Sequence, residues 1–131
     1  MTLKAWKEKY YPKEASKDMT TMQALDHSIL KWSGLSKATL DSFALTRHRF
    51  LVDEDNEGDL FVVGINTCAL CVKFIYEKCW GCPLFEVRGH TPCCEELGDE
   101  QVSPYDKFTV NGNPRPMLRW LHKARKMLEA E

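Results

Sequence analysis

Apolar residues recur at helical spacing in the first third of the chain. They lie three or four positions apart: Met22, Leu25, Ile29 and Trp32. This spacing gathers apolar side chains on one face of a helix, and a glycine such as Gly34 commonly ends one. The pattern predicts a helix that begins after a threonine cap at position 20 or 21 and runs to about residue 33.

The C-terminal stretch has the same period and adds a basic face. A proline at position 114 or 116 starts the predicted helix, which runs to about residue 128. Its apolar side carries Met117, Trp120, Leu121, Ala124 and Leu128. Its opposite side carries Arg115, Arg119, His122, Lys123 and Lys126. The pattern predicts an amphipathic helix with one face in the core.

Shorter patterns complete the expected architecture. Ser36 and Ser103 are typical helix caps, and Pro104 suits the first position of the helix that follows. The apolar runs 49–52 and 60–65 flank the acidic segment 53–59, which predicts a β-hairpin. Residues 1–18 form a short helix or an N-terminal arm. The expected fold is an α-rich α+β domain over residues 1–131, with helices around the β-hairpin and a compact cysteine node.

Composition narrows the class of protein. The chain has 131 residues, of which 44% are hydrophobic and 28% charged, and this is typical of one globular domain. The net charge of −1 argues against a bulk polycation that binds nucleic acid non-specifically. A run of about 18 apolar residues, as a membrane span requires, does not occur. The N-terminal residues have no apolar signal-peptide core, so the expected compartment is the cytoplasm.

Six cysteines stand out, and all of them lie between positions 68 and 94. Four form two CxxC pairs: Cys68 with Cys71, and Cys79 with Cys82. Cytosolic reductants keep thiols reduced, and two close CxxC pairs supply the four sulfurs of a tetrahedral zinc site. The sequence therefore predicts a structural Zn²⁺ held by these four residues. Three neighbours are substitutes for any one of them: His90, Cys93 and Cys94.

The spacer between the pairs imposes a condition on that site. A continuous helix from Cys71 to Cys79 would rise about 12 Å, too far for two ligands of one ion. Either the helix ends before Lys78 and the chain turns back, which we expect, or the two pairs do not share an ion. Gly81 tolerates positive φ and Pro83 prevents helix continuation, so the second pair is typical of a metal-binding knuckle.

Other chemistries of the cysteines stay open at this stage. An iron–sulfur cluster also takes four cysteines, although the spacing matches neither common ferredoxin pattern. Buried free thiols are a further alternative. A thiol oxidoreductase is a third, because the strand expected at 60–65 precedes Cys68 and Cys71 at the start of a helix, as in thioredoxin. A glycine-rich phosphate loop and a GxSxG element are absent from the sequence, so it does not favour an enzyme.

Two features indicate partners. Trp80 lies between two expected metal ligands, where the tip of a knuckle often projects outward, and could anchor a protein partner. The last 17 residues hold five basic and two acidic side chains, a local charge of +3. Its basic residues Arg115, Arg119, Lys123 and Lys126 suit an acidic protein groove or a phosphate backbone. A nucleic-acid-binding accessory protein is therefore the alternative to a protein-binding one.

The motifs together resemble a group of small cysteine-rich proteins encoded by bacteriophages. The resemblance covers about residues 22–106 and rests on Cys68-Ala69-Leu70-Cys71, Cys79-Trp80-Gly81-Cys82-Pro83-Leu84, Gly89, a cysteine at 93 or 94, Ser103-Pro104-Tyr105 and the upstream His27-Ser28-x-x-Lys31-Trp32. It carries no activity over to this chain. It implies a viral context, the host bacterial cytoplasm and an accessory role. The expected function is a non-enzymatic, zinc-stabilised interaction module that binds and modulates a host protein or defence complex.

Overall fold

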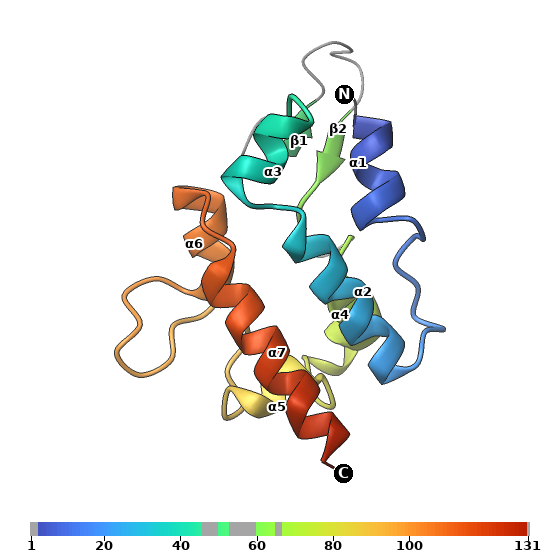
Figure 1. Cartoon of the computed structure of the whole chain (residues 1–131). Helices are drawn as coiled ribbons and strands as arrows, with labels where there is room; N and C mark the ends of the chain where they lie inside the picture. The colour runs from blue at the N-terminus through green and yellow to red at the C-terminus, as the bar shows by residue number, and fades with distance from the viewer. Residues whose placement is uncertain (1–2, 46–49, 53–59, 65–66, 131) are drawn as a thin grey trace.

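Helices make up most of the structure, a computed structural model that describes residues 3–45, 50–52, 60–64 and 67–130 (Figure 1). The helices are α1 (Leu3–Tyr10), α2 (Thr21–Ser33), α3 (Lys37–Ser42), α4 (Ala69–Phe74), the 3₁₀ turn η1 (Ile75–Glu77), α5 (Pro83–Val87), α6 (Pro104–Asn111) and α7 (Arg115–Glu129). Two short strands, β1 (Phe50–Val52) and β2 (Leu60–Val62), lie between α3 and α4. The expected α-rich fold is confirmed.

The two longest helices form the centre of the fold. α2 packs against α7 and α4, and α7 also packs against α5 (Figure 1). α2 begins with a capping box, in which the side chains of Thr20 and Gln23 each bind the other residue's backbone N–H. The side of α7 that carries Met117, Leu121 and Ala124 is buried. Both helices have the apolar faces and, within two residues, the bounds that their sequence patterns predict.

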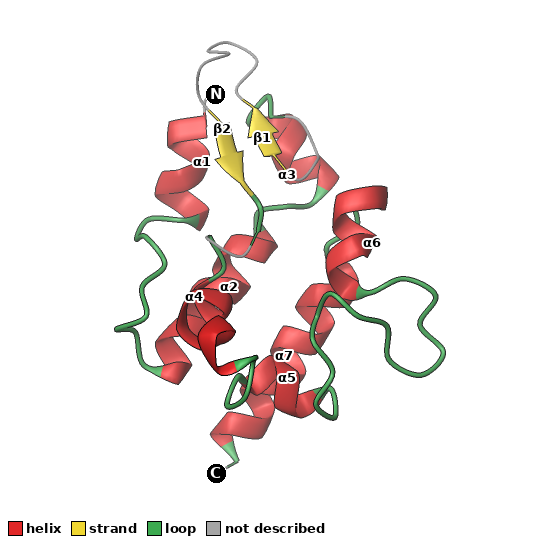
Figure 2. Ribbon diagram, turned by 180° about the vertical axis from the view of Figure 1, so that it is seen from behind, coloured by secondary structure: helices red, strands yellow, loops and turns green. Residues whose placement is uncertain are grey.

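The strands pair antiparallel, with Leu51 opposite Phe61. Both side chains are buried, because directly opposed residues point to the same face of a sheet. β2 lies beside α1 (Figure 2), and the ring of Phe61 is 5.2 Å from that of Trp6. The acidic turn predicted at 53–59 lies outside the described residues.

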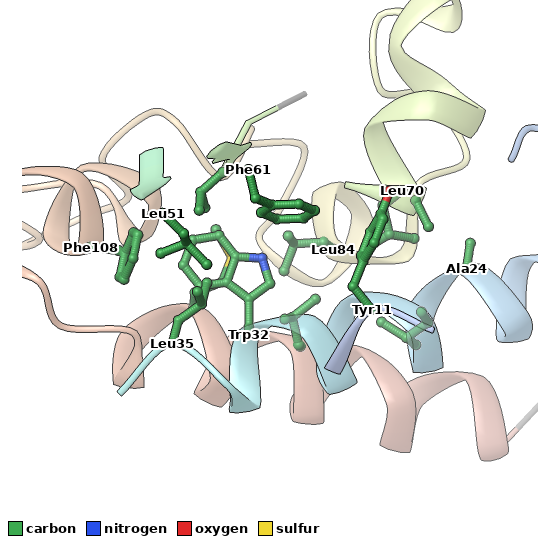
Figure 3. Close-up of a cluster of buried hydrophobic side chains, with 14 of the residues drawn as sticks. Tyr11, Ala24, Trp32, Leu35, Leu51, Phe61, Leu70, Leu84 and Phe108 are labelled. Carbon is green, nitrogen blue, oxygen red and sulfur yellow. The ribbon is translucent and has the colours of Figure 1, made fainter. Parts of the chain in front are cut away.

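A shared hydrophobic core joins the N-terminal helix to the rest. Figure 3 shows Leu51 and Phe61 of the strands facing Trp32 of α2. Trp6 is fully buried, and its indole Nε1 donates a 2.8 Å hydrogen bond to the carbonyl oxygen of Gly34 at the end of α2. A β-carbon at Gly34 would lie 2.4 Å from the ring of Tyr10, so glycine lets α1 approach this closely. These contacts fix α1 on α2.

We expect Trp6→Phe to lower the free energy of unfolding by about 1–3 kcal/mol, because it leaves the buried Gly34 carbonyl without its donor. Urea denaturation of the two proteins measures the difference. Trp80→Phe is the matched control, since Trp80 is 57% exposed and surface substitutions change stability by about 0.5 kcal/mol or less. Equal effects of the two substitutions would contradict the role given to the Trp6 hydrogen bond.

A buried ion pair fixes the acidic loop between α5 and α6. The Arg88 guanidinium is fully buried and binds both carboxylate oxygens of Glu100, at 3.0 and 3.1 Å. Glu100 also accepts hydrogen bonds from the backbone N–H of Leu97 and from the indole of Trp120. Arg88 lies 4.9 Å from the centre of the Trp120 ring. The loop is thereby held against α7.

The helices of the described segments include none with the length and apolar character that a membrane crossing requires.

Candidate metal centre

The first CxxC pair opens a short helix that ends where the sequence analysis requires. Cys68 occupies the N-cap of α4, and Cys71 lies in the first turn. α4 ends at Phe74 and continues only as the 3₁₀ turn η1. Lys78 and Cys79 then adopt left-handed backbone conformations, with φ of 54° and 71°. The chain therefore reverses before the second pair, as predicted.

The second pair has the turn geometry expected of a knuckle. Gly81 lies at φ +87°, which glycine adopts without steric cost. Cys82 is the N-cap of α5, and Pro83 is the first residue of that helix. Two leucines anchor the pairs in the core: Leu70 between the first two cysteines and Leu84 just after the second two. Each CxxC pair is therefore positioned by its own turn and by its own buried leucine.

One cavity of about 170 Å³ brings most of the cysteines together. Five of them line it: Cys68, Cys71, Cys79, Cys93 and Cys94. Its remaining wall includes Lys31 and Trp32 of α2 and two apolar residues of α7, Met117 and Leu121. Cys82 is buried beside this wall and does not line it. All six cysteines are free thiols. Segments that are up to 26 residues apart in sequence thus converge on one site.

The thiols of the first pair are strongly inequivalent. The Cys71 thiol faces the Cys68 sulfur and holds the pKa of Cys68 well below its usual range. Burial opposes this shift, while the ammonium of Lys31 and the hydroxyl of Ser28, 3.8 Å away, support it. The same interaction with Cys68 raises the pKa of Cys71, since Cys71 holds the shared proton.

For the other four cysteines, burial is the largest cause of the pKa shift, and the shift is upward. Loss of solvent raises the pKa of Cys82 to about 12, although the backbone amides of Leu84 and Phe85 lower it in part. Burial likewise raises the pKa of Cys79, Cys93 and Cys94. These thiols are protonated at neutral pH. Binding a metal through them would release protons, because only thiolates are good ligands.

Lys31 belongs to the sequence motif His27-Ser28-x-x-Lys31-Trp32, but no role in the site was predicted for it. Its side chain is fully buried on α2 and lines the cysteine cavity. Its Nζ lies 3.4 Å from the hydroxyl of Thr67 and 5.5 Å from the centre of the Trp32 ring. In the described segments it forms no ion pair with a carboxylate. The helical period places Lys31 next to the apolar face of α2, but lysine is a residue type that is usually exposed.

His90 lies apart from the cavity. Its Nε2 is 2.8 Å from a carboxylate oxygen of Glu86, and its ring stacks on Phe85. The side chain is about half exposed and does not line the cysteine cavity. Among the proposed substitutes, the structure therefore groups Cys93 and Cys94 with the CxxC pairs and leaves His90 outside.

The sulfur atoms share a cavity without being arranged as ligands of one ion. Across the described ranges, no three or more Cys, His, Asp or Glu side chains have a metal-binding arrangement.

The predicted partner residues lie on two surfaces. Trp80 is 57% exposed and contacts the rings of Phe85 and His90. Ile75 and Tyr76 of the preceding turn are also exposed. The basic side chains Arg115, Arg119, Lys123 and Lys126 are all exposed on α7, away from its buried side. The outward position of Trp80 agrees with its prediction, and its binding role stays a prediction.

We compared the chain with models of protein families, with curated proteins and with solved structures, and none of the three comparisons gave a match.

Proposed function

We propose that the cysteine cavity binds a structural zinc ion and that the protein is a non-enzymatic interaction module stabilised by that ion. The observation that supports this most is the cavity that five cysteines line, three of them from the CxxC pairs together with Cys93 and Cys94. Two cysteines suffice for redox chemistry, whereas a cluster of five soft sulfur donors suits Zn²⁺. In this proposal the helices and the strand pair β1–β2, as a hairpin, surround the zinc node.

The ligands we propose are Cys68, Cys71, Cys79 and Cys82. The first two come from one helical turn and the last two from one knuckle, so each pair is pre-positioned by its own backbone. Cys93 lines the same cavity and is the replacement for Cys82 or Cys79 if either does not reach the ion. Zinc would supply folding free energy by closing the loops around the site.

Metal analysis of the native protein, together with a count of its reactive thiols, tests the zinc proposal. We expect one zinc per chain and protection of four thiols from a thiol reagent until the ion is removed. Absence of zinc with four or more reactive thiols would overturn the proposal. Turnover of a disulfide substrate under those conditions would instead favour a thiol oxidoreductase, which the low pKa of Cys68 supports.

The proposed partner is a protein of the host cell. Three large apolar side chains between Cys71 and Cys82 are exposed: Ile75, Tyr76 and Trp80. Tryptophan and tyrosine are enriched among residues that dominate binding free energy in protein interfaces. The resemblance to phage proteins supports a bacterial cytoplasm as the setting of this surface, and a host protein or a defence complex is the proposed target.

A protein partner can be captured from a bacterial lysate by pull-down with this chain. We expect Trp80→Ala to weaken binding of that partner by about 30-fold, the effect of losing an interface residue that contributes about 2 kcal/mol. Titration calorimetry with that partner measures the change. Val110→Ala is the matched control, because Val110 is 74% exposed and lies on α6. Unchanged affinity of Trp80→Ala would rule out the Trp80 surface. Salt-dependent binding of DNA or RNA that is lost in Arg119→Glu would favour the basic face of α7 instead.

A further inference from the structure

Lys31 is buried without a carboxylate partner in the described part of the chain. Its side chain is fully enclosed, yet the contacts of its ammonium with described residues are a long hydrogen bond to Thr67 and the face of Trp32. A buried ammonium is strongly unfavourable unless a negative charge lies nearby. None of the ion pairs in the described segments includes Lys31. The position therefore indicates a negative charge that the carboxylates do not provide.

The cavity itself holds the groups that can provide this charge. Lys31 lines it together with Cys68, Cys71 and Cys93. Ser28, one helical turn before Lys31 on α2, lies 3.8 Å from the Cys68 sulfur, so this face of α2 is in contact with the first CxxC pair. α2 thus brings one positive charge to a wall made mostly of sulfur and apolar atoms.

We infer that Lys31 is the charge-compensating residue of the thiolate centre. This inference rests on the proposed zinc site. Four thiolates around a divalent ion leave two net negative charges, and the Lys31 ammonium neutralises one of them inside the protein. The ion and the lysine therefore favour each other: zinc binding creates the anionic partner of Lys31, and Lys31 reduces the cost of burying the anionic centre.

The test is Lys31→Met, which keeps the length of the side chain and removes its charge. Zinc affinity is measured by competition with a chromogenic chelator, and thermal unfolding is measured on the metal-free form of each protein. We expect zinc affinity to fall by about tenfold or more, as for other groups next to metal ligands. We expect the unfolding midpoint of the metal-free protein to rise, because a buried charge is gone. A residue with only a packing role would not shift the two quantities in opposite directions.

Two further variants serve as controls. Lys31→Arg retains the charge and is expected to keep more of the zinc affinity than Lys31→Met. Lys37→Met removes the same charge from an exposed position on α3 and is expected to leave zinc affinity unchanged. If Lys31→Met does not fold, the ammonium signal of Lys31 in the NMR spectrum of the wild-type protein gives an independent measurement. It is expected to shift when zinc is removed.

The outcomes separate this inference from the proposal beneath it. A wild-type protein that binds no zinc contradicts the proposed function itself. A wild-type protein that binds zinc, with Lys31→Met binding it equally well, overturns the role of Lys31 alone. An ammonium signal that does not respond to zinc removal likewise overturns it.

Discussion

Removal of zinc by a chelator is expected to lower the unfolding midpoint of the protein by about 12–20 °C. At free zinc of about 1,000 times the dissociation constant, an ion that binds only the folded state contributes about 4 kcal/mol. In a domain of this size, 1 kcal/mol corresponds to about 3–5 °C. Calorimetry with and without chelator, followed by zinc addition, measures the loss and its reversal.

The physical reason lies in what the cysteines hold together. They belong to α4, to the turn after η1, to the start of α5 and to the loop before α6. These elements are short, and helices of five or six residues are not stable by themselves. Without an ion, Leu70, Leu84 and their neighbours anchor this region in the core, together with the Arg88–Glu100 ion pair.

Serine variants separate the ligands from the bystanders. Cys71→Ser is expected to reproduce most of the loss caused by the chelator, because it removes a ligand that is held in the helix. Cys94→Ser is the matched control, since Cys94 is exposed and is expected to be dispensable. A midpoint unaffected by the chelator in wild type, or equal losses in the two variants, would contradict the four-cysteine assignment.

Glu100→Gln is expected to lower the free energy of unfolding by about 3 kcal/mol. Removing one partner of a buried ion pair leaves the other charge uncompensated, at a cost of about 3–5 kcal/mol. The side-chain oxygen of glutamine can still accept a hydrogen bond from Arg88, so we expect a loss at the lower end of this range. Arg88 has no exposed surface and so cannot regain its solvation without opening the loop. Urea denaturation measures the loss, and amide hydrogen exchange at Leu97 reports the opening of the loop.

An exposed ion pair provides the control for this prediction. Asp26 lies 2.7 Å from the guanidinium of Arg125, and both side chains are at least one-third exposed. Exposed pairs contribute about 0–1 kcal/mol, so Asp26→Asn is expected to have a small effect. A loss in Asp26→Asn as large as that in Glu100→Gln would contradict the importance of burial.

The same ion pair predicts a pH dependence. Partial burial raises the pKa of Glu100, but hydrogen bonds from Arg88, from the Leu97 amide and from Trp120 outweigh it and lower the pKa overall. A carboxyl whose pKa is lower in the folded state stabilises the protein above its unfolded-state pKa of about 4.3. That stability is lost as the pH falls through the folded-state pKa. Glu100→Gln is therefore expected to lose less stability than wild type on acidification.

The local patterns predicted the helices well. The Thr20 cap, the end of α2 before Gly34, the Ser103 cap and the start of α7 after Pro114 all occur as expected. Each of these signals acts within one turn of helix, through a capping hydrogen bond or a fixed φ, and so it is readable from neighbouring residues. The end of α4 at Phe74 was also predictable. A straight helix from Cys71 to Cys79 would hold their sulfur atoms too far apart to bind one ion.

Interactions between distant segments were not predictable in this way. In the sequence, Arg88 and Glu100 are charged residues in an acidic region, which is typical of exposed side chains. No neighbouring residue indicates that the two form a buried ion pair. A lysine on a helix is usually exposed to solvent, but Lys31 lines the same cavity as Cys68, which is 37 residues further along the chain. Burial of a charge depends on what packs around it, and that is set by the whole fold.

The sequence by itself determined where α2 and α7 begin and end and where α6 begins, that the fold is α-rich, and that the thiols are concentrated in one short region; α5 (Pro83–Val87) was not predicted. Only the tertiary structure decided which thiols share a cavity, that His90 is turned toward Glu86 instead, and that a lysine of α2 faces the sulfur atoms. The physical reason is the separation along the chain of the residues that interact. Caps, turns and helical periods are set by contacts over a few residues, whereas the composition of a cavity is set by the packing of α2, α4, α5 and α7 on one another.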